Sequence, residues 1–578
     1  MTESIKNADI AAAMDELGTL YELDGAVRYR VLAYREAARV IRASPVSVAE
    51  LARDGKATEL PGIGATLQDK IVALLDTGEI PSATKLKAKF PSSLLEVTRI
   101  PGLGAKTARR LFDELGVASL EDLREAAENE RIRGLKGLGP KVEENVLASL
   151  AKIGEEGAPG RLLLSQVLPV AEALAAELRA HPASEAVEVA GSARRRTETC
   201  KDIDLIATAT DPAALAGALA ANSLVSQAGN PGASGVHVTT HNGVSVDLRI
   251  VAPDAYGNLL QHFTGSAGHN IELRERAVAA GLSVSEHGIK DVETSDVARY
   301  GTEEEVYERL GLAYIEPELR EGTGEIAAAA AGELPDLVEI ADIRGDLHCH
   351  TTLSDGRNSL EEMAAAARGR GYSYLAVTDH SASHGFGNHV TAERLWERIG
   401  EVREVDERLP KRFRLLAGSE VNILPDGSLD YPDDLLAELD WVIASVHTSF
   451  RISGKAMTER VITAIQNPNV DCIGHLTGRL IGRREPYDID VEQVAAAAAA
   501  EGTMLEINGN PNRRDLSEHH ARLAAAAGVR ICVNTDAHGT DTLANMQYGI
   551  ATARRAWLTR ADVANTRTWA AFQKLRKR

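Results

Sequence analysis

The chain has 578 residues, 44% of them hydrophobic and 26% charged, which suffices for about four domains and excludes a disordered or fibrous protein. No apolar run approaches the ~20 residues of a membrane span, and neither a secretory signal nor a disulfide framework is expected, so the predicted compartment is the cytoplasm. The net charge of −20 disfavours a nucleic-acid partner, but residues 1–150 are nearly balanced, with 21 Lys and Arg against 23 Asp and Glu. The run 99–110 (RIPGLGAKTARR) holds cations and no acid, so DNA binding is not excluded.

A short phrase recurs three times in the amino-terminal region, as LPGIG at 60–64, IPGLG at 100–104 and LKGLG at 135–139. Each phrase precedes a helical pattern, and strand-like runs are almost absent, so residues 1–155 are predicted to be all-α. Glycine permits a tight turn whose backbone N–H groups can hold a phosphate oxygen at the start of the next helix. The predicted DNA-binding residues are Gly62, Gly64, Gly102, Gly104 and Lys106. The third phrase, with Lys136 in place of proline, is equally well explained as a structural turn.

A linker is predicted at 153–160, followed by an α/β unit with strands at 186–190, 203–207 and 244–251. Asp202 and Asp204 share one strand face, and Asp247 lies in an apolar strand, where a carboxylate needs a metal or hydrogen-bond partner. Three converging carboxylates are typical of two Mg²⁺ ions that align nucleotidyl transfer. A lone DxD pattern would favour solvated aspartates. The Gly191-Ser192 turn upstream, with its arginines, and the third aspartate favour the functional interpretation.

These residues resemble the nucleotidyltransferase palm of family X DNA polymerases, and the resemblance covers residues 1–318. It implies that Asp202, Asp204 and Asp247 bind two Mg²⁺ ions, with Asp247 nearest the primer 3′-hydroxyl. It also implies a nucleotide site formed by Arg161, Gly191, Ser192, Arg195, His262, Phe263, Gly265, Asn270 and Arg274. The family commonly has Tyr at the sugar pocket, where this chain has His262. Lys70 falls where eukaryotic relatives keep a Schiff-base lysine for 5′-deoxyribose-phosphate removal, but a lone surface lysine is usually just solvated.

In the last third of the chain, apolar runs alternate with Ala-rich helical patterns. Seven such runs, near residues 343, 375, 415, 442, 472, 505 and 531, predict a distorted parallel (β/α)7 barrel. Nearly every run ends in a metal-ligand type of residue, and the ends of parallel strands converge on one face. A single histidine of this kind is usually a hydrogen-bonded core residue, but six at successive strand ends favour a metal site. The candidate ligands are His348, His350, Asp355, His380, Glu420, His447, His475, Asp536 and His538.

Imidazoles mixed with carboxylates favour Mn²⁺, Zn²⁺ or Fe²⁺, and nine ligands imply two or three ions, a cluster suited to phosphoester hydrolysis. From about residue 343 onward, this pattern resembles the PHP (polymerase and histidinol phosphatase) family. The resemblance implies three ligand groups: His348, His350, Glu420 and Asp536; Glu420, His447 and His475; and Asp355, His380 and His538.

The two resemblances together imply a multidomain enzyme. Its implied parts are helix-hairpin-helix domains at 1–80 and 81–155, a palm at 156–255, a thumb at 256–320, a linker at 321–340 and a PHP domain at 341–578. The implied activity is gap filling in base excision repair, with dNTPs added to gapped or primer-template DNA. The Mn²⁺ or Zn²⁺ site is implied to act as a 3′-5′ exonuclease and as an AP endonuclease or 3′-phosphodiesterase. The implied working form is a monomer. One alternative is a polymerase whose PHP domain is only a metal-stapled structural or DNA-binding module. A free-standing phosphatase would leave residues 1–340 without a role.

Overall fold

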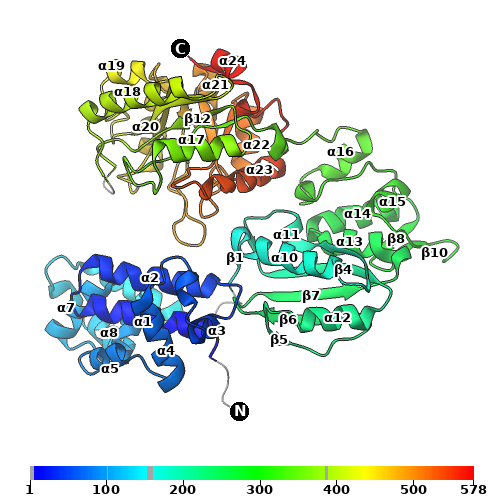
Figure 1. Ribbon diagram of the computed structural model, residues 1–578, viewed down its shortest axis with the longest axis horizontal. Helices are drawn as coiled ribbons and strands as arrows, with labels where there is room; N and C mark the ends of the chain where they lie inside the picture. Colours follow the sequence, from blue (N-terminus) through cyan, green and yellow to red (C-terminus); the bar gives the residue numbers. More distant parts are fainter. Residues whose placement is uncertain (1–4, 101, 153–159, 385–387, 578) are drawn as a thin grey trace. The chain divides into compact units, whose positions relative to one another are not determined.

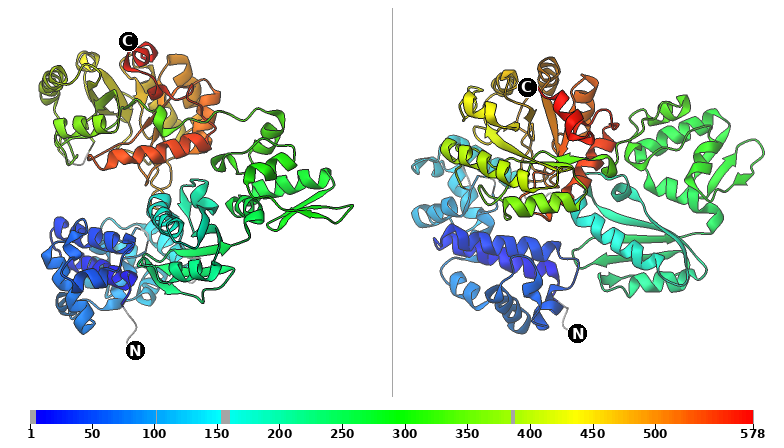
Figure 2. Two further views of the ribbon diagram at one scale, coloured as in Figure 1. Left: turned by 45° about the vertical axis from the view of Figure 1, so that its right-hand side comes forward. Right: turned by 45° about the horizontal axis from the view of Figure 1, so that its top comes forward.

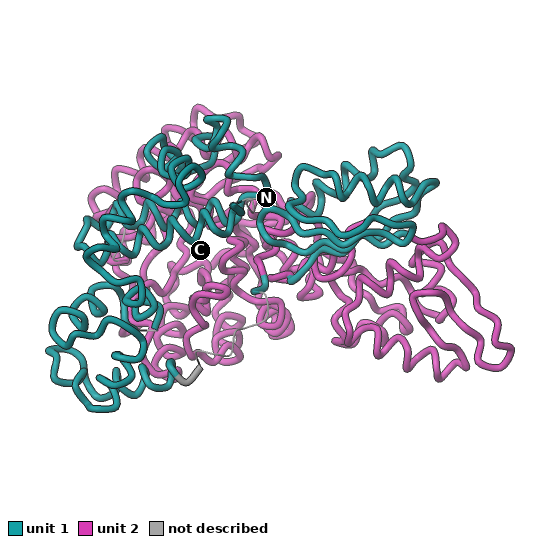
Figure 3. Tube along the Cα trace, turned by 90° about the horizontal axis from the view of Figure 1, so that it is seen from below, with its two compact units in different colours: residues 1–161, 170–187, 201–250 teal, residues 162–169, 188–200, 251–578 magenta. Residues whose placement is uncertain are grey.

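The computed structural model describes residues 5–100, 102–152, 160–384 and 388–577. The chain divides into two compact units (Figure 3): residues 1–161, 170–187 and 201–250 form the first, and residues 162–169, 188–200 and 251–578 form the second. None of the helices in the described ranges is long and apolar enough to cross a membrane.

The amino-terminal part of the first unit is entirely helical in the described residues between 5 and 152, as predicted (Figure 1). One apolar cluster extends from Ile10 to Leu150, so the domains predicted at 1–80 and 81–155 share a hydrophobic core. Leu17 and Leu20 of the first helix are completely buried in it. The helices are α1 (Asn7–Leu23), α2 (Arg28–Ala43), α3 (Val48–Arg53), α4 (Ala65–Thr77), α5 (Pro81–Lys87), α6 (Ser92–Val97), α7 (Ala105–Leu115), α8 (Leu120–Glu128) and α9 (Pro140–Lys152).

A mixed five-stranded sheet in the order β2-β4-β7-β6-β5 follows the helical part. Its strands are β2 (Ser184–Val189), β4 (Asp202–Ala209), β5 (Val225–Ala228), β6 (Gly235–Thr240) and β7 (Ser245–Ile250), with helices α10 (Leu164–Arg179) and α12 (Pro212–Ala220). β4 and β7 are parallel neighbours, whereas β6 is antiparallel to both β7 and β5. The sequence pattern predicted β2, β4 and β7 but missed β5 and β6. β5 has four residues and none of them is buried, whereas β6 does alternate, with Val236 and Val238 buried, and was overlooked.

The second unit begins with short segments around the Gly191 turn: β1 (Leu162–Leu163), α11 (Gly191–Arg194) and β3 (Thr199–Cys200), with β1 antiparallel to β3. The following part contains helices α13 (Tyr256–Thr264), α14 (Ala267–Ala279), α15 (Glu303–Arg309) and α16 (Glu325–Ala331). It also contains an antiparallel sheet of β8 (Leu282–Ser285), β9 (Gly288–Asp291) and β10 (Val297–Ala298), which the sequence analysis did not predict.

The segment predicted as a linker, 321–340, differs from that expectation because α16 packs against the preceding domain. Ile326 and Ala329 of α16 belong to the same buried cluster as Leu273 of α14. Glu325 is completely buried, and its Oε1 lies 2.8 Å from Nδ1 of His269. The Gly/Ala/Glu-rich composition suggested an exposed connection, but small residues also allow close helix packing.

A buried ion-pair network holds α15 in place, and it yields a stability prediction. Glu303 accepts hydrogen bonds from Arg194 (Nη2 to Oε2, 2.6 Å) and from the fully buried Arg320. Burial raises the pKa of Glu303, but Arg320 and Arg194 together lower it below its usual value. Because the folded pKa is depressed, the ionised carboxylate stabilises the fold above the unfolded pKa, and this stabilisation is lost as the pH falls through the folded pKa.

We expect Glu303→Gln to destabilise the second unit by about 3 kcal/mol at pH 7, because it leaves buried guanidinium groups without their counter-charge. Calorimetric unfolding at pH 7 and at successively lower pH should show the largest difference from the unmodified protein at neutral pH and a smaller one in acid. Glu304→Gln, at the exposed neighbouring position, is the matched control and should change little. An equal loss in both variants would contradict the prediction.

The carboxy-terminal part of the second unit is a barrel of seven parallel strands in sequential order, as predicted (Figures 1 and 2). The strands are β11 (Gly345–Asp346), β12 (Tyr374–Val377), β13 (Arg414–Asn422), β14 (Trp441–Ser445), β15 (Cys472–Ile473), β16 (Met504–Asn508) and β17 (Ile531–Asn534). The helices outside them are α17 (Leu360–Gly369), α18 (Ala392–Arg408), α19 (Asp433–Glu438), α20 (Gly454–Gln466), α21 (Val491–Glu501), α22 (Glu518–Ala526), α23 (Met546–Arg555) and α24 (Trp569–Phe572).

The first and last barrel strands meet just beyond their ends. Leu347 N donates to Asn534 Oδ1 at 3.2 Å, and Cys349 forms a parallel bridge with Ala537. Trp441 and Phe572 are completely buried in a separate apolar cluster of the barrel domain. The seam between the first and last strands brings the segments after β11 and after β17 side by side, and both segments carry predicted metal ligands.

Candidate metal centres and binding turns

All nine ligands predicted in the barrel domain lie in one group at the carboxyl ends of the strands, and six of them are buried. His348 and His350 follow β11, and Asp536 and His538 follow β17 across the seam. His350 Nε2 lies 3.1 Å from Asp536 Oδ1, although 186 residues separate the two in sequence. The rings of His380 and His538 both lie 4.3 Å, centroid to centroid, from that of His350. The barrel topology therefore produces the convergence that the strand-end pattern predicted.

Glu420 of β13 is the central carboxylate of this group. Its Oε1 lies 2.8 Å from His475 Nε2 and 3.1 Å from His447 Nε2, and its Oε2 lies 2.8 Å from His380 Nδ1. Donor atoms close enough for one cation form three overlapping sets: His350, Asp355, His380 and His538; His348, His350 and Asp536; and His380, Glu420 and His447. These sets differ from the groups implied by the resemblance in four ways. His350 also joins the Asp355 set, and His380 also joins the Glu420 set. Glu420 is missing from the His348 set, and His475 is missing from the Glu420 set.

The protonation states of these groups differ: His350 and His447 are held neutral, and Glu420 and Asp536 are held ionised, whereas His380 is held in its protonated form and would have to release that proton to bind a metal. Burial, aided by neighbouring imidazolium charges, lowers the pKa of His350 to about 4, and burial also lowers that of His447 to about 4. Burial opposes protonation of His380 too, but the Glu420 carboxylate and other contacts raise its pKa to about 10. Although burial acts against ionisation, the surrounding histidines hold the pKa values of Glu420 and Asp536 well below the usual range. Ionised carboxylates and neutral imidazoles are the forms that bind metal.

Several donor atoms in this group are buried without a hydrogen-bond partner among the described residues. They are His348 Nε2, His350 Nδ1, His475 Nδ1 and Glu420 Oε2. A buried polar atom without a partner costs free energy, and native proteins satisfy nearly all of them. Nitrogen and oxygen donors that converge from several strands therefore fit divalent cations.

The sequence analysis missed Glu506, a buried carboxylate of β16 that supports this group. Its Oε1 lies 2.7 Å from His348 Nδ1 and accepts from Asn534 Nδ2 at 3.0 Å. Its Oε2 accepts from the backbone N of His475 at 2.8 Å. Glu506 therefore orients two of the candidate ligands. It lies inside a strand rather than at its end, so no positional signal distinguished it.

The three aspartates predicted as a second metal centre lie on adjacent parallel strands in the first unit. Asp202 and Asp204 are both on β4, and Asp204 stands directly opposite Asp247 of β7 in the strand register. Strand alternation places all three carboxylates on one face of the sheet. Asp247 is only partly buried, and its Oδ1 lies 3.1 Å from Nδ1 of His237, a neighbour on β6 that the sequence analysis did not identify.

The predicted nucleotide-binding residues belong mainly to the second unit. Gly191 and Ser192 begin α11; His262 and Phe263 lie in α13, with their rings edge to face at 5.3 Å; and Asn270 and Arg274 lie in α14. Asn270 donates to the carbonyl oxygen of His262 at 2.9 Å, which ties the two helices together beside Gly265.

The three arginines of this predicted nucleotide site differ in their surroundings. Arg195 is largely buried: its Nε donates to Glu321 Oε1 at 2.9 Å, and its Nη1 donates to the carbonyl oxygen of Thr264. Arg274 is exposed, as is Arg161, which belongs to the first unit. A phosphate ligand of Arg195 would therefore compete with Glu321 for the guanidinium group.

The glycine phrases adopt one repeated conformation. Gly62, Gly102 and Gly137 have φ values of +78°, +88° and +85°, in the left-handed region that favours glycine. Gly64 and Gly104 then cap the starts of α4 and α7. Pro101 of the second phrase lies outside the described residues.

Two lysines near these turns were singled out from the sequence. Lys106 is exposed in the first turn of α7. Lys70 lies in α4, where its Nζ donates to Ser82 Oγ at 3.1 Å. Lys106 is thus accessible beside a helix start, whereas Lys70 has a hydrogen-bonding partner within the helical part.

Comparisons with known proteins match each part of the chain. Family models match residues 5–80 (helix-hairpin-helix domain), 94–152 (SAM-like helix-hairpin-helix tandem), 259–321 (DNA polymerase beta thumb) and 346–510 (PHP domain). The "DNA polymerase/3'-5' exonuclease PolX" of Bacillus subtilis (strain 168) is 37% identical over 562 residues, which cover 97% of each chain. A probable phosphatase of Thermoanaerobacter sp. (strain X514) is 34% identical over 233 residues, covering 38% of this chain and 89% of that protein. A probable phosphatase of Caldicellulosiruptor saccharolyticus is 32% identical over 202 residues, covering 33% of this chain and 79% of that protein.

Proposed function

Because the chain belongs to the family X DNA polymerases that carry a carboxy-terminal PHP domain, we propose that it fills short gaps during base excision repair and processes 3′ ends at the barrel. The enzyme is a DNA polymerase with a 3′-5′ exonuclease. The observation that carries the proposal is the presence of two distinct ligand groups, one of three carboxylates on adjacent strands and one rich in imidazole at the barrel. Both activities would act on one gapped or primer-template DNA, and tethering would raise the local concentration of a released primer end at the second site.

For nucleotide addition, we assign Asp202, Asp204 and Asp247 as ligands of two Mg²⁺ ions. When bound, two such ions would stabilise both the attacking and the leaving oxygen of an in-line displacement. Asp247 would lie nearest the primer 3′-hydroxyl. Ser192 and Arg195 would hold the triphosphate, with Gly191, Gly265 and Arg161 around it, and His262, Phe263, Asn270 and Arg274 would line the sugar and base.

For phosphodiester hydrolysis, we assign the nine barrel residues as ligands of two or three Mn²⁺ or Zn²⁺ ions. The ions would lower the pKa of water and stabilise negative charge on the phosphate. Glu506 would keep His348 and His475 oriented through its hydrogen bonds. The same centre would serve as the 3′-phosphodiesterase or AP endonuclease. The sequence similarity of the barrel to probable phosphatases supports phosphoester chemistry there.

For DNA binding, we assign the turns at Gly62, Gly64, Gly102 and Gly104, with Lys106, to non-specific contacts with the phosphate backbone. Such contacts need only amides and a few cations. For Lys70 to act as a lyase nucleophile, an apolar pocket or a second cationic group would have to activate its amine. Its identified partner, Ser82, is a hydroxyl and carries no charge, so we rank the lyase activity below the other two. We assign the working form as a monomer.

One assay tests the two activities together. We expect a one-nucleotide-gapped duplex with Mg²⁺ and dNTPs to be extended, and the same duplex with Mn²⁺ and no dNTPs to be shortened from its 3′ end. The products are resolved on a sequencing gel. Extension without any shortening in Mn²⁺ or Zn²⁺ would contradict the proposed use of the barrel, and shortening without extension would contradict the proposed use of the three aspartates.

A further inference from the structure

Three arginines of the barrel domain contact the short turn that links α11 to β3, residues 195–198, within the second unit. This turn directly follows Gly191 and Ser192 in the chain. The arginines come from separate places: Arg479 from the loop after His475, Arg514 from the loop after β16, and Arg555 from the end of α23. The barrel thus reaches the turn from three segments that are distant in sequence.

Arg555 makes the most central of these contacts. Its Nη1 donates to the carbonyl oxygen of Arg195 at 2.9 Å and to Glu321 Oε1 at 2.8 Å, and its Nη2 donates to Glu518 Oε1 at 2.9 Å. Only 6% of its side chain is exposed. Glu321 Oε1 also accepts from Arg195 Nε at 2.9 Å. Arg555 therefore holds both the backbone of Arg195 and the carboxylate that orients the Arg195 side chain.

Arg514 and Arg479 fix the next residues of the turn. Arg514 is 1% exposed, and its Nη1 donates to the carbonyl oxygen of Arg196 at 3.0 Å. Arg479 forms a two-point ion pair with Glu198, in which Nη1 lies 3.3 Å from Oε2. Hydrogen bonds from buried charged donors are among the stronger ones in proteins, and a bidentate pair also fixes orientation.

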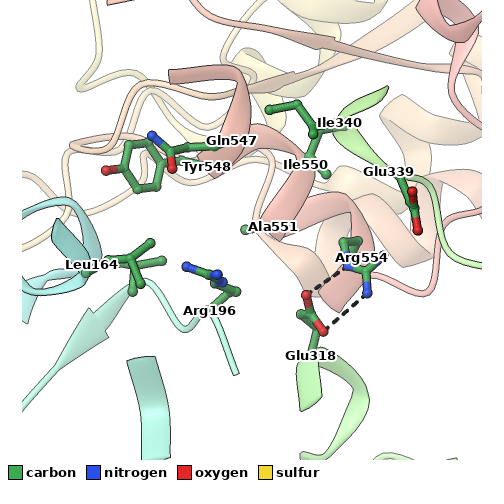
Figure 4. Close-up of a pocket in the computed structure, with 11 residues that line it drawn as sticks. Leu164, Arg196, Glu318, Glu339, Ile340, Gln547, Tyr548, Ile550, Ala551 and Arg554 are labelled. Atoms are coloured by element: carbon green, nitrogen blue, oxygen red, sulfur yellow. Dashed lines mark hydrogen bonds and ion pairs between the residues drawn. The ribbon is translucent and has the colours of Figure 1, made fainter. Parts of the chain in front are cut away.

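The side chain of Arg196 lines a pocket of about 340 Å³ (Figure 4). Leu164, Tyr548 and Ala551 line the pocket with it. Arg554, the neighbour of Arg555 on α23, lies across this pocket, and its Nε pairs with Glu318 Oε1 at 2.8 Å. The barrel arginines therefore divide into two kinds: Arg555, Arg514 and Arg479 hold the turn, whereas Arg554 holds the end of the thumb.

We infer that Arg555, Arg514 and Arg479 are positioning residues for nucleotide addition, through which the PHP domain holds the turn at residues 195–198, and with it the preceding α11, in place. The inference rests on the proposed function, in which Ser192 and Arg195 bind the incoming triphosphate. Arg555 and Arg514 donate to carbonyl oxygens of the turn itself, so they fix the main chain that carries these ligands. Without Arg555, the backbone of Arg195 could move, and Glu321 would pair with the Arg195 side chain alone. Both changes should weaken triphosphate binding more than they slow the chemical step.

The first test measures the KM for dNTP and the kcat on a one-nucleotide-gapped duplex. We expect Arg555→Ala to raise the KM about tenfold with a smaller fall in kcat, as the loss of charged hydrogen bonds implies. Arg555→Lys should recover part of the loss because it keeps one charged donor. Arg554→Ala is the matched control, with the same residue type on the same helix, and its KM should stay unchanged. Exonuclease activity on single-stranded DNA and thermal unfolding are measured for every variant.

A second test approaches the contact from the polymerase side. Glu198→Gln, Arg479→Gln and the double variant form a cycle, in which the double variant should raise the KM no further than either single one. If Arg555→Ala does not fold, this cycle tests the inference in its place. An unchanged KM in Arg555→Ala, a rise equal to that in Arg554→Ala, or additive effects in the cycle would overturn the inference. A parallel loss of kcat, exonuclease activity and thermal stability would also overturn the inference, because it would show that the substitution disturbs folding in general. Failure of the unmodified protein to add nucleotides would instead refute the proposed function.

Discussion

Replacement of Asp247 by alanine is expected to lower nucleotide addition by about a thousandfold or more, because a two-metal centre supplies several kcal/mol and each 1.36 kcal/mol is a factor of ten. Asp247 stands opposite Asp204 in the register of β4 and β7, so its removal would leave two carboxylates for two ions. The 3′-5′ exonuclease should be retained, since no residue of the barrel cluster belongs to this sheet.

The measurement is single-nucleotide addition on gapped DNA beside 3′ shortening of the same labelled strand without dNTPs. Asp254→Ala provides the control, because Asp254 is an exposed carboxylate seven residues further along the chain with a surface partner, Arg299, at 3.4 Å. It should leave both activities near those of the unmodified enzyme. Equal loss of both activities in Asp247→Ala would refute the independence of the two centres.

Replacement of His350 by alanine is expected to remove the 3′-5′ exonuclease, again by about a thousandfold, because His350 belongs to two of the three overlapping ligand sets. The imidazole lies against Asp536 and between the rings of His380 and His538. Its loss would weaken two cation sites at once. Gap filling with Mg²⁺ should continue, because the three aspartates are untouched.

Two measurements check this result, namely 3′ shortening in Mn²⁺ and the amount of Mn²⁺ or Zn²⁺ retained after dialysis, determined by elemental analysis. His519→Ala is the control, since His519 is an exposed histidine on α22 outside the cluster. Retained exonuclease in His350→Ala would place the hydrolytic chemistry elsewhere. Metal bound by the unmodified protein without any cleavage would favour a structural or DNA-binding PHP module.

The sequence predicted the large-scale architecture well where a pattern repeats. All seven barrel strands were located, because buried parallel strands are continuous apolar runs and each one alternates with a helix. The antiparallel strands β5 and β8 to β10 were missed, since they have two to four residues each, and the six-residue β6 was missed although its buried and exposed positions alternate. The helix α16 was mistaken for a linker, because its burial depends on partners such as His269 that lie far away in sequence.

The candidate site was predictable to the extent that topology alone brings residues together. Strand ends converge in any parallel barrel, so the nine candidate ligands could be predicted from the sequence. Glu506 could not, because a carboxylate inside a strand is recognised as a support only once its hydrogen bonds to His348 and His475 are known. The same holds for Arg555, whose partner Arg195 lies 360 residues earlier in the chain.

The seam of the barrel has a consequence for biosynthesis. The proposed hydrolytic site uses both His350 and Asp536, which are 186 residues apart, and at about 5 to 20 residues per second a ribosome takes on the order of 10 to 40 s to travel between them. During that interval the nascent chain already includes the whole palm sheet, but it lacks Asp536 and therefore a complete proposed hydrolytic site. A translation product that terminates before β17 would therefore carry the three aspartates proposed for nucleotide addition. It would lack the proposed exonuclease site that removes a mispaired primer end.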